Sequence, residues 1–316
     1  VGLASVLLAA ILATINFDLK RVLAYSTVSQ LGYMITAVGI GALFESQLYL
    51  FSHAIFKALL FLGAGAVIHE LGTRNMRMMG GLGRRMPWVA IPFLIGAAAL
   101  VGLPFFNGFW SKELLLENAF HVAPIIVYIP LVFGAALTAF YSARMCRMVF
   151  FGGQRSDVVH EMSKVSPFMI VPLLILAAGV IVAWVFAEPF AHWMAQTMPF
   201  HAAFILPERT IDDLISTHTV FTISTGIVLC VTTVGLFLGW RAANTSMLDK
   251  PASPLARAAE QTGIIYDKSS AFEATLTHDV AAALQKTQTG VLNWNIAGIV
   301  LGVIALLILL MQGALR

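Results

Sequence analysis

His53 and Lys57 lie four residues apart in the apolar segment SHAIFKALLF, and Tyr49 precedes His53 by the same interval. On a helix these side chains share one face. Charged residues in mid-bilayer are expensive and usually face the bundle interior, where they mark ion or proton paths. Because burial disfavours the ammonium form and histidine titrates near neutral pH, the pattern predicts proton handling. The alternative is a snorkelling lysine beside a hydrogen-bonded core histidine, and the position of Lys57 far from either end of its segment argues against it.

Lys112 and Glu113 form a second charged site in the segment GLPFFNGFWSKELLLEN. They follow Gly102 and Pro104, residues that break helices, and a break can admit water to an adjacent lysine. Neighbouring helical residues point about 100° apart, so we expect each to face a different partner. Glu113 would tune the proton affinity of Lys112. Glu117 lies one turn further along. It either belongs to the proton path or lies at an interface.

The remaining charged clusters give weaker signals. Asp18, Lys20 and Arg21 form a short charged hinge, and a simple topogenic loop explains the two basic residues. His192, His201 and His218 cluster near acidic residues and could form a metal site, but their spacing is not specific for one. The acidic residues in question are Glu208, Asp212 and Asp213.

The elements that must position these residues are membrane spans. The chain has 316 residues, 59% hydrophobic and 11% charged, which excludes an ordinary soluble enzyme. A span needs about 20 mostly apolar residues. Eight segments qualify: 1–17, 22–43, 47–68, 87–120, 124–150, 167–187, 216–240 and 293–312. The fourth is too long for one straight crossing, so it predicts a helix broken near its middle. Because the chain opens with Val1 inside an apolar run, we interpret it as a fragment.

Alternation of eight spans places 15 of the 19 Lys and Arg residues in or beside the loops on one side of the membrane, Arg144 and Arg147 among them, and only Arg209 and Arg316 on the other side. The positive-inside rule predicts that the basic side is cytoplasmic. Lys57 and Lys112 remain inside spans. Residues 241–292 are polar enough to leave the membrane, and apolar residues at steps of seven and four predict an amphipathic helix over 267–288. It is either a surface helix along the bundle or an ordinary connection.

Several chemistries find no support in the sequence. A net charge of +3 without basic blocks argues against nucleic-acid binding. The chain has no GxGxxG after a strand, P-loop, HExxH, GxSxG or cysteine cluster for iron–sulfur, and Cys146 and Cys230 lie in apolar runs. We therefore expect no redox cofactor and no metal in this chain.

Four ordered segments resemble the antiporter-like proton-translocating subunits of respiratory complex I, of the subunit L or mitochondrial subunit 5 type. They are DLKRVLAYSTVSQLGYM (18–34), LFSHAIFKALLFLGAGAVIH (50–69), MGGLGRRMP (79–87) and GLPFFNGFWSKELLL (102–116). GIIYDKSSAF (263–272), the amphipathic stretch and the final span resemble that subunit's lateral helix and last transmembrane helix.

The resemblance implies an all-α polytopic membrane bundle of about eight spans. Residues 1–150 would be the C-terminal half of a proton-translocating domain, holding one half-channel. Residues 151–240 would add further spans, 241–292 a cytoplasmic-side loop and the lateral helix, and 293–316 the terminal span.

Within that arrangement the resemblance assigns roles. Lys57 would be the connecting lysine of a central hydrophilic axis with His53 beside it, and Lys112 the lysine that exchanges protons with one side. Glu113 stands where the family commonly has Asp, and Asp18 matches an acidic position. NADH, FMN, iron–sulfur clusters and quinone would be bound by partner subunits, and a neighbouring antiporter-like subunit and the bilayer would be contacts. The membrane would be the bacterial inner membrane.

The sequence departs from the family in two ways, and several other functions stay open. The amphipathic stretch looks shorter than the family's lateral helix, and the N-terminal half with its own Glu and Lys pair is absent. The chain could instead belong to a multisubunit Na+/H+ antiporter, a membrane-bound hydrogenase or an inorganic-carbon uptake complex. It could also be a passive structural subunit or, least supported, an intramembrane enzyme that uses Lys and His as acid and base.

Overall fold

A computed structural model describes residues 1–153, 165–197 and 222–243, with Thr275 and Asp279. The chain divides into two compact units, Val1–Ser253 and Pro254–Arg316, and the helices described below belong to the first. Apart from Thr275 and Asp279, the predicted amphipathic helix over 267–288 lies outside the described residues. The last span at 293–312 lies outside them too, as do His201 and His218 with the neighbouring Glu208, Asp212 and Asp213.

The described residues form helices and no strands, which confirms the predicted helical bundle. The main helices are α1 (Gly2–Ile15), α2 (Leu19–Gly39), α3 (Leu43–Leu71), α5 (Pro87–Val101), α6 (Asn107–Val122), α7 (Ile125–Phe150), α8 (Pro167–Val182), α9 (Ala187–Thr197) and α12 (Ile223–Ala242). Short helical turns η1 (Met76–Met78), α4 (Leu82–Arg85) and η3 (Ala183–Phe186) connect them. The largest apolar core brings together residues of α1, α2, α3, α5, α6 and α7.

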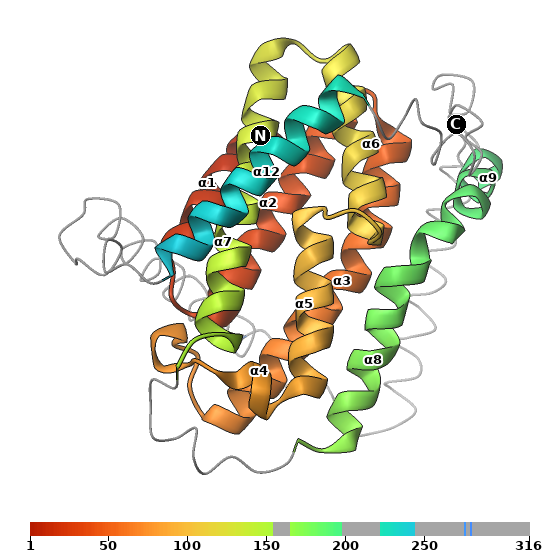
Figure 1. Cartoon of the computed structure of the whole chain (residues 1–316). Helices are drawn as coiled ribbons and strands as arrows, with labels where there is room; N and C mark the ends of the chain where they lie inside the picture. The colour runs from red at the N-terminus through yellow and green to blue at the C-terminus, as the bar shows by residue number, and fades with distance from the viewer. Residues whose placement is uncertain (154–164, 198–221, 244–274, 276–278, 280–316) are drawn as a thin grey trace. The chain divides into compact units, whose positions relative to one another are not determined.

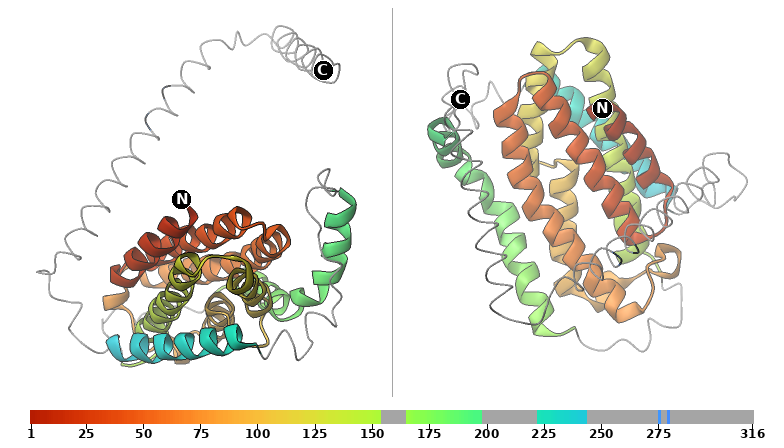
Figure 2. Two further views of the ribbon diagram at one scale, coloured as in Figure 1. Left: turned by 90° about the horizontal axis from the view of Figure 1, so that it is seen from above. Right: turned by 180° about the vertical axis from the view of Figure 1, so that it is seen from behind.

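Four described segments are long and apolar enough to cross a membrane: Leu43–Leu71, Ile125–Phe150, Pro167–Phe190 and Ile223–Ala242. Gly2–Ile15 and Pro87–Val101 are shorter apolar helices. The helix α2 has sufficient length, but polar residues such as Ser26, Ser29 and Gln30 make it less apolar, and all three are buried. The protein is therefore an integral membrane protein whose helix α2 keeps these three polar residues inside the bundle. Figure 2 shows α2 and α3 side by side in the view from behind.

The predicted break in segment 87–120 is confirmed. The helix α5 ends at Gly102, which has a left-handed φ of 85°, and α6 begins at Asn107. Phe105 between them also has a positive φ, of 76°, a conformation uncommon for a residue other than glycine. A Cβ added at Gly108 would clash with the Ala99 carbonyl, so glycine allows α6 to start directly against the end of α5.

The helix α12 packs mainly against α7 and crosses in front of it in Figure 1. The contact is close because Gly235 and Gly239 face the carbonyls of Ala136 and Phe140 with no room for a Cβ. Glycines four residues apart are a common means of close helix approach in membranes. This packing places the first turn of α12 beside α6.

The structure places Arg144 differently from the sequence-based charge count. The count assigns Arg144 to the basic loops, yet it lies inside α7 with only 2% of its surface exposed. Its Nη1 donates to the carbonyls of Thr14 and Asn16, at 2.5 and 3.1 Å, and its guanidinium stacks on Phe17. The assignment is wrong because sequence hydropathy does not show that carbonyls at the C-terminal end of α1 accept hydrogen bonds from this side chain.

Candidate functional site

Lys57 is buried in the middle of α3 and contacts α2. Its Nζ donates to the Leu23 carbonyl at 3.1 Å and to the Ser26 hydroxyl, and 5% of its surface is exposed. Both partners are neutral acceptors, so the described contacts do not fix Lys57 in a salt bridge. The side chain does not snorkel to a helix end.

His53 lies one turn before Lys57 on the same buried face. Its ring packs edge-on to Phe56, with centroids 5.3 Å apart, and to Tyr49 at 6.3 Å. Its Nε2 is buried and makes no hydrogen bond to a described residue. Close by, the Asn107 amide donates to the Ser52 carbonyl at 3.3 Å, which joins the start of α6 to α3.

Lys112 and Glu113 are both buried one turn into α6, with exposures of 2% and 6%. The Lys112 Nζ makes no hydrogen bond to a described residue and lies 5.2 Å from the centre of the Tyr33 ring. The Glu113 carboxyl lies beside the Thr225 side chain of α12. The adjacent side chains thus address different helices, as their spacing predicts.

A chain of buried polar side chains extends from Lys57 toward Lys112, and sequence reasoning missed it. The Ser26 hydroxyl accepts from Lys57, donates to the Leu23 carbonyl at 2.8 Å and lies beside the Tyr141 hydroxyl of α7. The Gln30 amide nitrogen faces Thr138 at 3.3 Å and Tyr141 at 3.5 Å.

The far end of this chain reaches the broken helix. The Gln30 carbonyl oxygen accepts from Tyr49. Tyr33, one turn further along α2, faces Lys112 with its ring and donates from its hydroxyl to the Leu131 carbonyl at 2.6 Å. We refer to Ser26, Gln30, Tyr33, Tyr49, Thr138 and Tyr141 as the polar chain.

A signal for the polar chain is present in the sequence. Ser26, Gln30 and Tyr33 recur at steps of four and three, which places them on one face of a helix. Polar residues on one face of a membrane span usually point into the bundle. Their partners on α7 cannot be identified from the sequence, because the pairing of helices is set by packing.

Glu45 is a second residue that sequence reasoning missed. The predicted span begins at residue 47 and leaves Glu45 in a loop, but α3 begins at Leu43 and buries Glu45 to 3% exposure. The Asn118 amide of α6 donates to its carboxylate at 3.2 Å. Glu45 therefore helps to join the first turn of α3 to α6.

Asp18 has a structural contact at the hinge. Its carboxylate accepts the backbone N–H of Arg21 at 3.0 Å and caps α2, and its backbone pairs with Asn75. The described contacts of Asp18 are with this hinge, so the structure does not bring it together with Lys57 or Lys112. No group of three or more metal-ligating side chains occurs among the described residues.

Comparison with known proteins identifies related sequences. Residues 1–138 match the sequence model of the family described as "NADH:quinone oxidoreductase/Mrp antiporter, TM". NADH-quinone oxidoreductase subunit L of Campylobacter jejuni is 42% identical over 194 residues, covering 61% of this chain and 32% of that protein. NADH-ubiquinone oxidoreductase chain 5 of Acanthamoeba castellanii is 40% identical over 197 residues, covering 60% and 29%. The chain thus spans about a third of these relatives.

A solved structure shares the fold. In the structure of the Mrp complex from a Dietzia species, a chain 25% identical superposes with a TM-score of 0.61, covering 96% of this chain and 32% of its own length. The arrangement of the described helices, α8 to α12 included, therefore lies within a known membrane-protein fold.

Proposed function

We propose that this chain is part of a proton-translocating membrane subunit of an NADH:quinone oxidoreductase, because residues 1–138 match the model of the NADH:quinone oxidoreductase/Mrp antiporter transmembrane family. The names of the subunit L and chain 5 relatives support this assignment. Electron transfer would take place in partner subunits that bind NADH, FMN, iron–sulfur clusters and quinone.

The observation that carries the proposal is the pair of buried lysines joined by the polar chain. A proton held by Lys57 can pass to the Ser26 oxygen. The Ser26 hydroxyl, which donates to the Leu23 carbonyl, would then turn and give its own proton to Tyr141, because a hydroxyl both accepts and donates. Tyr141 would in turn release its hydroxyl proton toward Lys112. That last transfer needs bridging water or side-chain movement, because among the described residues no hydrogen bond joins Tyr141 to Tyr33 or Tyr33 to Lys112.

The same proposal covers the roles of the other predicted residues and segments. His53 would modulate Lys57 from the preceding turn, Glu113 would modulate Lys112, and Asp18 would act through the geometry of α2. Residues 1–150 would form one half-channel, with 151–240, 241–292 and 293–316 as added spans, lateral helix and terminal span. The partner would be a neighbouring antiporter-like subunit in a bacterial inner membrane, with the basic loops on the cytoplasmic side.

The test uses inverted membrane vesicles that contain the assembled complex with the full-length chain. Lys57→Met should reduce NADH-driven acidification while leaving complex assembly normal, because methionine fills a similar volume without carrying a proton. Lys20→Met, at an exposed position of the hinge, is the matched control. Normal acidification with Lys57→Met would overturn the proposal, and loss of assembly alone would favour a passive structural role.

The likeness to the Mrp complex favours one second candidate, a subunit of a multisubunit Na+/H+ antiporter. The same vesicles separate the two functions. If NADH drives no acidification in the wild type but a Na+ gradient moves protons in a Lys57-dependent way, the antiporter assignment replaces the first one.

A further inference from the structure

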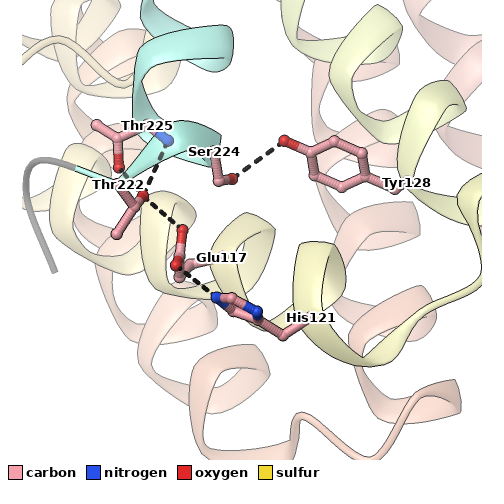
Figure 3. A network of polar contacts seen from close by, with 6 residues as sticks. All are labelled: Glu117, His121, Tyr128, Thr222, Ser224 and Thr225. Atoms are coloured by element: carbon pink, nitrogen blue, oxygen red, sulfur yellow. Dashed lines mark hydrogen bonds and ion pairs between the residues drawn. The ribbon is translucent and has the colours of Figure 1, made fainter. Parts of the chain in front are cut away.

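A hydrogen-bonded chain continues from Glu113 away from the polar chain, toward the end of α6. The Glu113 carboxyl lies beside the Thr225 side chain of α12, and the Thr225 and Thr222 hydroxyls lie 2.9 Å apart. Thr222 donates to the Glu117 carboxylate at 2.7 Å, and the other Glu117 oxygen lies 2.9 Å from His121 Nε2. Figure 3 shows this series from Thr225 to His121.

Exposure rises along the series. Glu113 is buried, the Glu117 side chain is 16% exposed, and the His121 side chain is 65% exposed. The three residues are spaced four apart on α6, so they lie along one face of the helix, from beside Lys112 to the end of α6. The Thr225 and Thr222 hydroxyls of α12 lie between the two acidic side chains of this series.

We propose that Glu117 and His121, bridged to Glu113 by Thr225 and Thr222, form the port through which Lys112 exchanges protons with water. This inference rests on the proposed function and adds residues to it. Hydrogen bonds connect Thr225, Thr222, Glu117 and His121 in series, and Glu113 lies beside Thr225 at the buried end of that series.

Each transfer conserves the proton. A protonated Glu113 gives its proton to the Thr225 oxygen, while the Thr225 hydroxyl proton moves to Thr222 and the Thr222 hydroxyl proton moves to the Glu117 carboxylate. Glu117 then protonates Nε2 of a neutral His121, which releases the proton on Nδ1 to water. His121 returns to its first tautomer by exchange with solvent.

The alternative explanation is that these side chains only hold α12 in place. Other contacts already do this. The first turn of α12 is capped by the Thr222 hydroxyl, which accepts the Thr225 N–H at 3.1 Å. Ser224 is hydrogen-bonded to Tyr128 of α7 at 3.1 Å, as Figure 3 shows. Anchoring of α12 therefore does not require an exposed histidine paired with Glu117.

The test measures the rate of NADH-driven acidification in the same inverted vesicles. The Lys112-dependent part of that rate is the rate of the wild type minus the rate of Lys112→Met. His121→Ala should lower this part by about three- to tenfold. That loss is smaller than the 10²–10⁴ typical of a positioned proton-transfer group, because Glu117 retains some contact with water. Added imidazole should restore the rate in His121→Ala, since a small base can replace a missing proton carrier but not a structural contact.

Three further variants test the buried part of the port. Glu117→Gln and Thr222→Val should lower the Lys112-dependent part at least as much as His121→Ala, without rescue by imidazole, while Glu117→Asp should retain part of it. Thr233→Val, whose hydroxyl bonds its own helix at Leu229, is the control for α12. His69→Ala is the control for the histidine, because His69 is 68% exposed and also pairs with a glutamate.

The outcomes distinguish the two proposals. If Lys112→Met changes nothing, the proposed function fails. If Lys112→Met lowers acidification but His121→Ala and Thr222→Val match their controls, the port is wrong and the function stands. Loss of rate in His121→Ala without imidazole rescue would also overturn the port, because it would indicate a structural contact.

Discussion

Replacing Arg144 by methionine should loosen the junction between α1 and α7. The Arg144 guanidinium donates to the carbonyls of Thr14 and Asn16 and stacks on Phe17, 4.2 Å from the ring centre. Helices leave their last four carbonyls without a helical partner, so both acceptors lose a buried donor in the variant. Hydrogen bonds to charged groups contribute about 1.5–3 kcal/mol each, and methionine recovers part of the packing. The expected loss in the free energy of unfolding is about 3–5 kcal/mol.

The assay is thermal unfolding of the purified complex in detergent, with Arg147→Met as the matched control one turn away. Arg147 is half-buried and stacks on Trp240 at 4.7 Å, so its loss should be only about 0.5–1 kcal/mol. The loss for Arg144→Lys should fall between those of the two methionine variants, because lysine keeps the charge but lacks the planar guanidinium group with its several donors. Equal unfolding midpoints for Arg144→Met and Arg147→Met would refute the reasoning.

Two other perturbations test the packing and the polar chain. Gln30→Leu should reduce NADH-driven acidification while the complex still assembles, because leucine removes the amide between Tyr49 and Tyr141. The control is Ser29→Ala, which should leave acidification unchanged because the Ser29 hydroxyl bonds Val6 of α1 instead. Gly239→Val should lower the unfolding midpoint and displace α12 from α7, because a side chain there meets the Phe140 carbonyl. Gly226→Val on the same helix is the control, since Gly226 has open space around it. Similar midpoints for the two glycine variants would contradict the glycine contact.

Much of the fold is predictable because apolar segments of sufficient length must span the bilayer as helices. The break at Gly102 and Pro104 follows from residues that end helices, and the structure confirms it between Val101 and Asn107. Helix ends are less predictable, since Asp18 starts α2 earlier than hydropathy indicates and Glu45 is drawn into α3.

The site is predictable only in its charged residues. Lys57, His53, Lys112 and Glu113 stand out because charge inside an apolar segment is rare. Tyr141 and Thr225 do not, because hydroxyl residues are common in membrane helices and become partners only when α7 and α12 pack against the rest. Arg144 is misplaced for the same reason, since its carbonyl partners lie some 130 residues away in the sequence.

The most direct test of the central claim is the number of protons transferred per NADH oxidised in inverted vesicles carrying Lys112→Met in the full-length chain. Proton translocation through this chain predicts a lower ratio than in the wild type, with assembly intact and with Lys20→Met unchanged. An unchanged ratio in Lys112→Met, in a fully assembled complex, would contradict the claim that protons pass through this chain.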